Sequence, residues 1–496
     1  MKSLVKSYFD NHKLNEHQIE SYNDFIENRL QKIINEFGYI DTDIKNYKIK
    51  LGKIRVGQPI IKEADGSVRK ITPMEARIRD LTYSAPIYLE LIGIEEENGE
   101  EKVIETIEVY IGELPVMLGS KICILHGKSE EELIELGEDP KDPFGYFIIN
   151  GTERVLITQE DLIPNRIICE FTEKNNKEIA LSKVFSVRHG FRALCTVERH
   201  PDGLLYVTGP GLSGNVPLVV VMRALGAETD KDIIEAVNDP RFAVEILLNI
   251  QEIREEFGVN TQEDALEYIG KRIAPNQSKE YRIRKAKSVL MNNFLPHLGV
   301  REEDFIKKIK FLGIMTRNTL ELYFGYRGED DKDHYAFKRA KLAGDLLEEL
   351  FRSAFSQLTK DIKYQLSKQT LRNKKPSIKA AVRSDIITDR IKHAMATGTW
   401  VTGKTGVSQL LDRTSYLATN SQLRRIVSPL SRSQPHFEAR ELHGTHWGKI
   451  CPSETPEGQN CGLVKNFALM AKITRDEDDN VVIEFLKKFG IKEFNI

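Results

Sequence analysis

Four arginines in the C-terminal third of the chain lie in a segment that offers them no helix. Arg413, Arg424, Arg425 and Arg432 fall among Ser, Thr, Gln and Asn residues between positions 398 and 459. A guanidinium group donates bidentate hydrogen bonds to phosphate oxygens, and short polar side chains bind phosphate as well. Loops of this length inside a folded chain are usually functional. The pattern favours contact with nucleic acid.

The net charge of the chain conceals a strongly basic segment. The whole sequence has 72 Lys and Arg against 74 Asp and Glu, a formal charge of −2, which by itself argues against a dedicated nucleic-acid binder. Lys363–Arg432, however, holds 14 basic and 3 acidic residues, and residues 1–362 carry a compensating net charge of −11. The first part of this window, Lys363–Arg383, is equally consistent with a solvated helix face.

Two carboxylates lie in a turn that prolines make rigid. Residues 451–460 read CPSETPEGQN, which places Glu454 and Glu457 between two prolines and a glycine. Such a pair could act as general acid and base, but neither residue has a nucleophile or a metal ligand close by in the sequence. Orienting the neighbouring arginines is the more economical role.

A phosphate-binding motif occurs in an unfavourable context. Residues 398–405 (GTWVTGKT) fit G-x4-G-K-[ST], the loop of nucleotide hydrolases. That loop requires a buried strand before it, whereas Ile378–Thr397 has the periodicity of an amphipathic helix. Gly398 is more simply explained as the C-cap of that helix. A free-standing nucleotide hydrolase remains the alternative.

Metal-ligand residue types recur at His443, His446, Cys451 and Cys461. The chain has no Cys-x2-Cys pair, and nine residues between the two cysteines is wide for a structural zinc site. Hydrogen-bonding histidines and packed cysteines explain the pattern equally well. We predict no metal site on this chain.

Helices and strands of several kinds must position these groups. Asn-Gly pairs at 98–99 and 150–151, each between apolar runs, predict β-hairpins, and Pro201-Asp-Gly203 predicts a turn between strands. Apolar residues at helical spacing predict helices at 14–37, closed by Gly38, at 230–237, 262–273, 279–295, 302–323 and 343–366, and from Ile378 to Thr397. A charged break at 328–334 suggests a domain boundary.

Length and composition exclude several classes of protein. The 496 residues suggest about three domains. No apolar run approaches the ~20 residues of a membrane span, and the first residues lack the apolar region of a secretory signal. Five widely spaced cysteines make a disulfide framework improbable, so we expect a folded protein in the reducing cytoplasm without a membrane association.

Two dense stretches of sequence resemble the second-largest subunit of multi-subunit RNA polymerases. They are SQLRR at 421–425 and ELHGTHWGKICPSETPEGQNCGLVKN at 441–466. Further landmarks follow the family's order at 75–86, 145–155, 223–226, 331–334 and 396–400. The resemblance covers essentially the whole chain, in the archaeal and eukaryotic version of the subunit. The resemblance does not extend to the family's hybrid-binding, wall and anchor regions, which would follow the matched part. This division resembles that of methanogenic archaea, which make the subunit as two polypeptides. A truncated form of a longer subunit is the alternative.

The resemblance implies an α+β multidomain architecture. It places a protrusion at 14–164 and 334–390, an inserted lobe at 165–333, a fork at 391–470 and the start of an external domain at 471–496. Residues 398–408 and 428–437 would be two fork loops, the first near the RNA–DNA hybrid and the second near the downstream edge of the bubble.

The resemblance also implies a function and a set of site residues. The chain would be one component of a DNA-dependent RNA polymerase, in which Gln409, Arg413, Arg424, Arg425 and Arg432 contact RNA, template or nucleotide. Asp412, Glu454 and Glu457 would orient those side chains. No catalytic residue is expected on this chain alone, because the ligands of the catalytic Mg²⁺ lie mainly on the largest subunit.

Partners and drug response follow from the same resemblance. The expected partners are a B prime subunit, the largest-subunit chains, small polymerase subunits, template DNA and the RNA transcript. General transcription and elongation factors would bind the protrusion and the lobe. Gln422 and Val427 stand where bacterial polymerases carry a drug-contacting His and a Ser, which predicts weak or absent inhibition by rifamycins.

Overall fold

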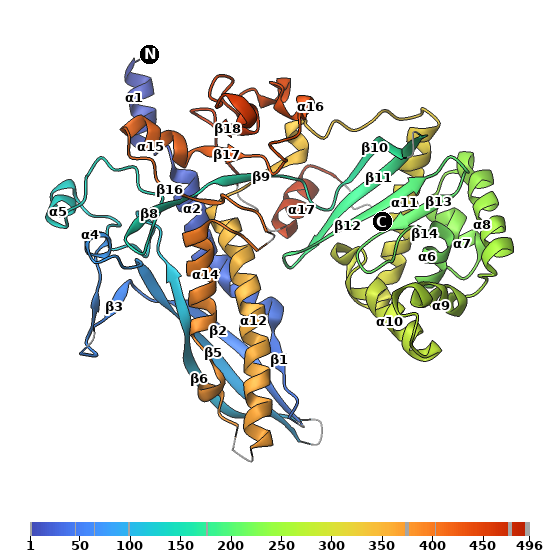
Figure 1. The fold of residues 1–496 in the computed structure, drawn as a ribbon, viewed down its shortest axis with the longest axis horizontal. Helices are drawn as coiled ribbons and strands as arrows, with labels where there is room; N and C mark the ends of the chain where they lie inside the picture. Colours follow the sequence, from blue (N-terminus) through green and yellow to red (C-terminus); the bar gives the residue numbers. More distant parts are fainter. Residues whose placement is uncertain are drawn as a thin grey trace. The chain divides into compact units, whose positions relative to one another are not determined.

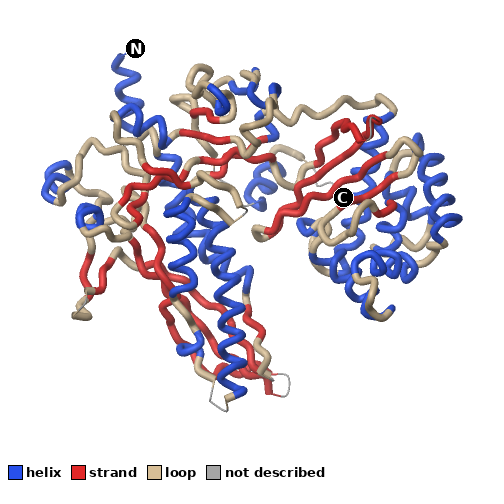
Figure 2. Tube along the Cα trace, in the orientation of Figure 1, coloured by secondary structure: helices blue, strands red, loops and turns tan. Residues whose placement is uncertain are grey.

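The chain folds into two compact units. The computed structural model describes residues 2–44, 46–63, 65–97, 100–174, 177–372, 376–401, 403–474 and 479–491. Unit 1 comprises Met1–Asp161 and Ala340–Ile496, and unit 2 comprises Leu162–Arg339 (Figure 1). Both contain helices and sheets (Figure 2), which confirms the predicted α+β multidomain class. The protrusion, lobe and fork ranges stay predictions.

The main core of unit 1 lies between a four-stranded antiparallel sheet and two helices. The strand order is β1-β2-β5-β6, and α12 and α14 lie along the sheet (Figure 1). Leu346, Leu350 and Phe351 of α12 are buried against Leu89 and Leu91 of the sheet. The bounds are β1 (Tyr39–Asp41), β2 (Tyr47–Val56), β5 (Ser84–Glu97), β6 (Glu100–Pro115), α12 (Ala343–Leu371) and α14 (Asp385–Thr397).

The helix predicted near the N-terminus is confirmed. It consists of α2 (Glu16–Asp24), a π-helical turn at Phe25–Arg29 and α3 (Leu30–Phe37), and it ends at Gly38, whose φ is +63°. Shorter α1 (Lys2–Asn11) precedes it. The buried face of α2 and α3 packs into the same core as α12 and the sheet.

The hairpins predicted from Asn-Gly pairs are formed by the strands that flank them. β5 and β6 pair along their whole length up to Glu97 and Glu100, and Asn98-Gly99 itself lies outside the described residues. Between β7 (Phe147–Ile149) and β8 (Thr152–Leu156), Asn150 has a φ of 47° and Gly151 a φ of 73°. Two successive positive φ angles are those of a type I′ turn.

The prediction of a single helix from Ile378 to Thr397 is wrong. The structure has α13 (Ile378–Ala381) and then α14, separated by extended backbone at Val382. Ile378 and Ala381 are fully buried, and Val382 packs against the same core, so tertiary packing overrides the local helical periodicity. The prediction that Gly398 caps the helix is confirmed, because Gly398 has a φ of +76° and donates its N–H to the carbonyl of Ala394.

Smaller elements of unit 1 carry the loops of interest. One sheet has the strand order β15-β9-β17-β18, another β16-β8-β7, and a third consists of β3 and β4. These strands are β3 (Ile60–Lys62), β4 (Val68–Lys70), β9 (Thr158–Leu162), β15 (Lys338–Lys341), β16 (Ser408–Leu410), β17 (Arg425–Val427) and β18 (Val464–Asn466). The remaining helices are α4 (Pro73–Ile78), α5 (Glu130–Glu135), α15 (Tyr416–Leu423), α16 (Phe437–Arg440) and α17 (Asp479–Lys488).

Unit 2 combines a five-stranded antiparallel sheet with a group of helices. The strand order is β10-β11-β12-β13-β14, and the hydroxyl of Ser182 in β11 donates to the carbonyl of Met315 in α11 at 3.0 Å. The predicted helices at 230–237 and 262–273 are confirmed with those bounds. The elements are β10 (Ile167–Lys174), β11 (Lys177–Arg188), β12 (Phe191–Arg199), β13 (Leu205–Thr208), β14 (Val216–Pro217), α6 (Leu218–Ala224), α7 (Asp230–Val237), α8 (Ala243–Phe257), α9 (Gln262–Ile273), α10 (Lys279–Asn292) and α11 (Phe305–Tyr323).

All five cysteines are free thiols. Cys123, Cys169 and Cys195 are buried, and Cys461 is exposed. None of the helices that the structure describes combines the length and the apolar character of a bilayer-spanning segment.

The crossing of α2 over the start of α12 depends on a glycine, and this yields a first prediction. A Cβ at Gly344 would clash with the carbonyl oxygen of Ser21. Because backbone cannot yield as a side chain does, we expect Gly344→Ala to lower the free energy of unfolding of unit 1 by about 2 kcal/mol. Urea unfolding followed by tryptophan fluorescence measures this, since buried Trp400 belongs to unit 1.

The matched control is Gly444→Ala. A Cβ at Gly444 meets no atom within 4 Å. The unfolding midpoint of the Gly444→Ala protein should therefore stay close to that of the wild type. Equal stability of the Gly344→Ala protein and the wild type would contradict the predicted clash.

Candidate nucleic-acid interface

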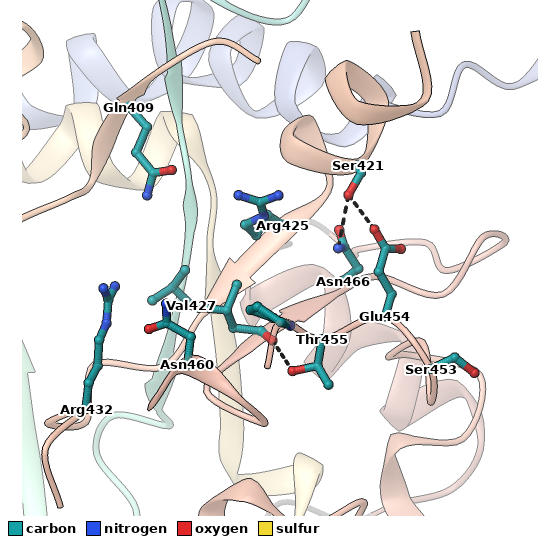
Figure 3. A pocket seen from close by; sticks show the side chains of 12 residues that line it. Gln409, Ser421, Arg425, Val427, Arg432, Ser453, Glu454, Thr455, Asn460 and Asn466 are labelled. Carbon is teal, nitrogen blue, oxygen red and sulfur yellow. Dashed lines mark hydrogen bonds between the residues drawn. The ribbon is translucent and has the colours of Figure 1, made fainter. Parts of the chain in front are cut away.

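Three segments that are distant in sequence meet at a polar pocket of unit 1. β16 pairs with β8, which places Gln409 opposite Val155, and β17 lies between β9 and β18, which places Arg425 opposite Asn466. The pocket has a volume of about 630 Å³ (Figure 3). Its lining residues are Gln409, Ser421, Arg425, Val427, Arg432, Ser453, Glu454, Thr455, Pro456, Asn460, Val464 and Asn466.

Four of the eight site residues predicted from sequence line this pocket. They are Gln409, Arg425, Arg432 and Glu454. No hydrogen bond or ion pair of the Arg425 or Arg432 guanidinium is found among the residues that the structure describes. Figure 3 shows both guanidinium groups without a dashed contact to the other residues drawn. These two cations are therefore available to an anion outside the chain.

Arg440 fixes the loop that carries Arg432. Its guanidinium donates to the carbonyls of Pro435 at 2.6 Å, Gln459 at 2.7 Å and Cys461 at 2.8 Å, and to that of Arg432 itself at 3.2 Å. One side chain thus joins the loop at 432–435 to the turn at 459–461. The sequence interpretation did not single out Arg440, and its partners are backbone atoms that no motif spacing identifies.

The proline-rich turn is attached to its surroundings by hydroxyl groups. Ser421 of α15 donates its hydroxyl to Glu454 (Figure 3). The Thr455 hydroxyl donates to the carbonyl of Val464 at 2.9 Å and accepts the N–H of Gly462 at 2.9 Å. Glu454 is therefore oriented by a fixed partner at the pocket wall. Ser421, Thr455 and Asn466 all lie inside the two stretches of family resemblance at 421–425 and 441–466, so these stretches were the signal that could have found them.

Arg424 is a structural residue in this arrangement. Its side chain is buried, and its guanidinium donates to the carbonyls of Leu14 and, at 2.7 Å, Ala468. Burial lowers the pKa of this guanidinium, and the nearby Glu454 carboxylate opposes that shift. Its donors point to the protein, so the predicted nucleic-acid contact of Arg424 stays a prediction.

Arg413 is also engaged inside the chain. Its Nε donates to Glu153 at 2.7 Å, its Nη1 to Asp142 at 2.7 Å and its Nη2 to the hydroxyl of Tyr146 at 2.8 Å. Arg77 donates to the same Glu153 at 2.9 Å, so the loop after β16 is held against β8 by a shared carboxylate. The nucleic-acid contact predicted for Arg413 stays a prediction.

Asp412 and Glu457 lie outside the pocket lining. The carboxylate of Asp412 accepts the N–H of Thr414 at 2.9 Å, which lowers the pKa of Asp412, and the positive charge of Arg425 lowers it further. Asp412 therefore influences one of the two available cations through its charge. Glu457 is exposed and precedes the 3₁₀ turn at Gly458–Asn460.

The loop that fits a nucleotide-hydrolase motif follows a helix and not a strand. Trp400 is buried and donates its indole N–H to the carbonyl of Leu346 in α12 at 3.0 Å. Its backbone N–H donates to the carbonyl of Lys404 at 2.8 Å, which closes the loop, and Thr402 lies outside the described residues. The buried strand and following helix that this motif requires are therefore missing around Gly398.

The metal alternative has no supporting cluster in the described part of the chain. No group of three or more His, Cys, Asp or Glu side chains there could hold a metal ion. The imidazole of His443 instead contacts the hydroxyl of Thr445 at 2.7 Å, and His446 is buried.

The first half of the basic window is partly neutralised. Lys363 pairs with Asp43 at 2.8 Å, and Arg383 pairs with Asp385 at 2.9 Å. Lys374 and Lys375 lie outside the described residues.

Comparison with known families identifies the chain. Residues 13–389 match the family model described as RNA polymerase beta subunit. The chain belongs to this family. Residues 409–473, which include the whole pocket lining, match a second model described as RNA polymerase Rpb2, domain 3. The resemblance stated from the sequence is therefore confirmed.

Relatives of this polymerase subunit come from archaea. The chain is 76% identical to DNA-directed RNA polymerase subunit Rpo2N of Methanocaldococcus jannaschii and 63% identical to Rpo2N of Methanococcus vannielii, in each case over 99% of both sequences. It is 49% identical to subunit Rpo2 of Saccharolobus solfataricus over 98% of this chain and 43% of that protein. These matches confirm the prediction of the N-terminal half of the archaeal subunit in its split form.

A partly buried histidine, whose Nε2 is enclosed by the protein, gives a pH-dependent prediction. His17 contacts the ring of Phe467, and burial, followed by the charge of Arg424, lowers its pKa to about 3. The unfolded chain protonates this imidazole near its ordinary pKa of about 6.5, so acid favours unfolding in the window between the two values. Between pH 7 and pH 5 the wild type should lose about 2 kcal/mol more unfolding free energy than His17→Gln.

Urea unfolding at a series of pH values, followed by the fluorescence of Trp400, measures this difference. Other titrating groups are the same in both proteins and cancel in the comparison. Parallel stability profiles for the two proteins would contradict the burial of a neutral His17.

Proposed function

We propose that this subunit contacts RNA and template near the active centre of a DNA-dependent RNA polymerase, through Gln409, Arg425 and Arg432. The observation that supports this most directly is the contrast among the loop arginines. Arg413 and Arg424 donate their hydrogen bonds inside the chain, whereas Arg425 and Arg432 line one pocket, and within the described residues their guanidinium groups form no hydrogen bond or ion pair. An unpaired guanidinium beside a polar pocket is suited to bidentate contact with a phosphate.

The amide of Gln409 complements the two cations. Its Nε2 donates to the carbonyl of Gly406 at 3.1 Å, which orients the side chain and leaves its Oε1 as an acceptor. Phosphates accept hydrogen bonds only, whereas a ribose hydroxyl or a base edge can also donate one. Gln409 is therefore suited to a hydroxyl or base beside the phosphates that the arginines hold.

Acidic and buried residues act as positioning groups in this proposal. Glu454 is fixed by Ser421 at the pocket wall, and Asp412 acts on Arg425 through its charge. Arg424 and Arg413 anchor the segments on either side of α15. Glu457 completes this group of carboxylates that orient the cations.

The reaction of the assembled enzyme is nucleotidyl transfer, in which the RNA 3′-hydroxyl attacks the α-phosphate of a nucleoside triphosphate and releases pyrophosphate. Mg²⁺ stabilises the attacking and leaving oxygens of such a reaction, and we assign it mainly to the largest subunit. The share of this chain is electrostatic positioning. The isolated chain is expected to make no RNA.

The chain works as part of an assembly in the cytoplasm. A B prime chain, the largest-subunit chains and the small subunits surround it, and template DNA and transcript pass along it. Residues 14–164 and 334–390 form the protrusion, 165–333 the lobe, 391–470 the fork and 471–496 the start of the external domain. General transcription and elongation factors bind the protrusion and the lobe.

Charge removal at the pocket tests the proposal. In a polymerase reconstituted with Arg425→Ala or Arg432→Ala, we expect extension of an RNA primer on a DNA template to slow by about tenfold, the effect of one charged hydrogen bond. Loss of one phosphate contact should also lower the slope of log binding constant against log salt by about one.

The matched control is Arg55→Ala. Arg55 is an exposed arginine of β2 that pairs with Glu108 and lies in the same unit, away from the pocket. Its removal should leave extension and salt dependence unchanged. Wild-type extension rates in both pocket variants, or RNA synthesis by the isolated chain, would contradict the proposal.

The drug response provides an independent prediction. Gln422 is buried, accepts the N–H of Asp412 at 2.6 Å and donates to the carbonyl of Leu410 at 2.9 Å. Its amide is therefore engaged inside the protein where the bacterial enzyme offers a His to the drug. Rifampicin that abolishes synthesis by a bacterial polymerase should leave the reconstituted enzyme active, and inhibition at the same concentration would overturn this reading.

A further inference from the structure

Unit 2 has an exposed apolar and aromatic surface of its own. We name it the α8 surface and define it by Val244, Leu247, Leu248, Tyr323, Phe324 and Tyr326, all of which are exposed. Val244 is 69% exposed, Leu248 56% and Tyr326 62%. Helix α8 buries Ile246, Ile250 and Ile253 in the unit core on its opposite face, so it is apolar on both sides at its N-terminal end.

Contacts around the start of α8 link the aromatic rings to this helix. Phe242, which precedes α8, stacks on Phe324 with ring centroids 5.8 Å apart. Arg241 lies over the ring of Tyr326 at 4.7 Å. Arg199 lies over the ring of Tyr323 at 3.6 Å and donates to Glu245 of α8 at 2.7 Å. The aromatic rings at the end of α11 and the first turns of α8 are therefore held together in one rigid patch.

The cations of this patch are already neutralised. Both Nε and Nη2 of Arg199 donate to Glu245. Arg241 donates to Asp239 at 2.6 Å and to Glu321 at 2.8 Å. A surface that bound single-stranded nucleic acid would combine stacking rings with cations free to meet phosphates. The pairing of these arginines therefore disfavours nucleic acid as the occupant.

Acidic side chains extend the patch along α8. Glu252, Glu255 and Glu256 are exposed in the C-terminal half of the helix, and none of them forms an ion pair with a Lys or Arg among the residues that the structure describes. Arg254 pairs with Asp230 instead. The outer face of α8 thus changes from apolar at its first turns to negative at its last.

We propose that the α8 surface docks a basic amphipathic helix of a partner protein, with apolar side chains over Val244 and Leu248 and Lys or Arg side chains over Glu252 and Glu255. Rigid aromatic anchors and packed arginines are typical of protein interfaces, and an exposed apolar patch of this kind marks one. Complementary charge fixes the orientation of the bound helix. Docking at the α8 surface rests on the proposed function, in which the lobe binds protein factors. The test of docking measures peptide binding and not transcription, so each proposal can fail while the other holds.

A designed peptide pair tests the docking surface. The probe is a fluorescein-labelled 18-residue amphipathic helix of Leu and Lys, and its partner peptide has Glu in place of Lys. Fluorescence anisotropy with the full chain should show binding of the Leu/Lys peptide and at least tenfold weaker binding of the Leu/Glu peptide. Val244→Ser with Leu248→Ser should weaken the first interaction at least tenfold without any change in charge.

Two further variants separate this site from general attraction to acidic surfaces. Glu252→Lys with Glu255→Lys should reverse the preference between the two peptides. Phe191→Ser, at an exposed apolar residue of β12, should leave both affinities unchanged. Circular dichroism melting confirms that each variant is folded. Unchanged peptide affinity in the Val244/Leu248 variant, no reversal in the Glu252/Glu255 variant, or weaker binding of labelled single-stranded RNA by the Val244/Leu248 variant than by the wild type would overturn the proposal.

Discussion

The guanidinium of buried Arg424 joins three parts of unit 1 that are far apart in the sequence. It donates to the carbonyl of Leu14 at the start of the N-terminal helix and to that of Ala468 after β18, while its own backbone leads into β17. A buried charge is tolerated only when its donors are satisfied, so the three segments must stay together for this arginine to be stable. Because Arg425 is the next residue in the chain, the fixed position of Arg424 also fixes the position of the Arg425 backbone at the pocket.

The arginines around the pocket fall into two groups, those that hold the chain together and those that can bind a ligand. Arg440 and Arg413 bind backbone carbonyls or carboxylates and thereby hold loops in place, and Arg425 and Arg432 remain available. Because Arg440 and Arg413 hold the backbone of these loops in place before a ligand arrives, binding does not have to order the loops, which lowers its entropy cost. The net positive charge of the 363–432 window is thus partly structural, because Arg413 and Arg424 donate their hydrogen bonds inside the chain.

Local patterns predicted much of the fold, and distant contacts account for what they missed. Periodicity located α9 at Gln262–Ile273, and Asn150-Gly151 identified its hairpin, because both signals act over a few residues. The break at Val382 depends on core packing that no local pattern contains. For the site, loop context and family resemblance brought Gln409, Arg425 and Arg432 forward. They could not distinguish these from Arg413, whose partner Glu153 is 260 residues away, or from Arg424, whose partner Leu14 is 410 residues away.

The central claim is that the pocket at Gln409, Arg425 and Arg432 faces the nucleic acid in the working enzyme. Photocrosslinking tests it most directly, with 4-thiouridine placed at successive positions of the transcript in a stalled elongation complex and the crosslinked peptides identified by mass spectrometry. We expect crosslinks from positions near the RNA 3′ end to peptides within 409–432 or 453–466. Efficient crosslinking to the polymerase without any product in these two segments would contradict it.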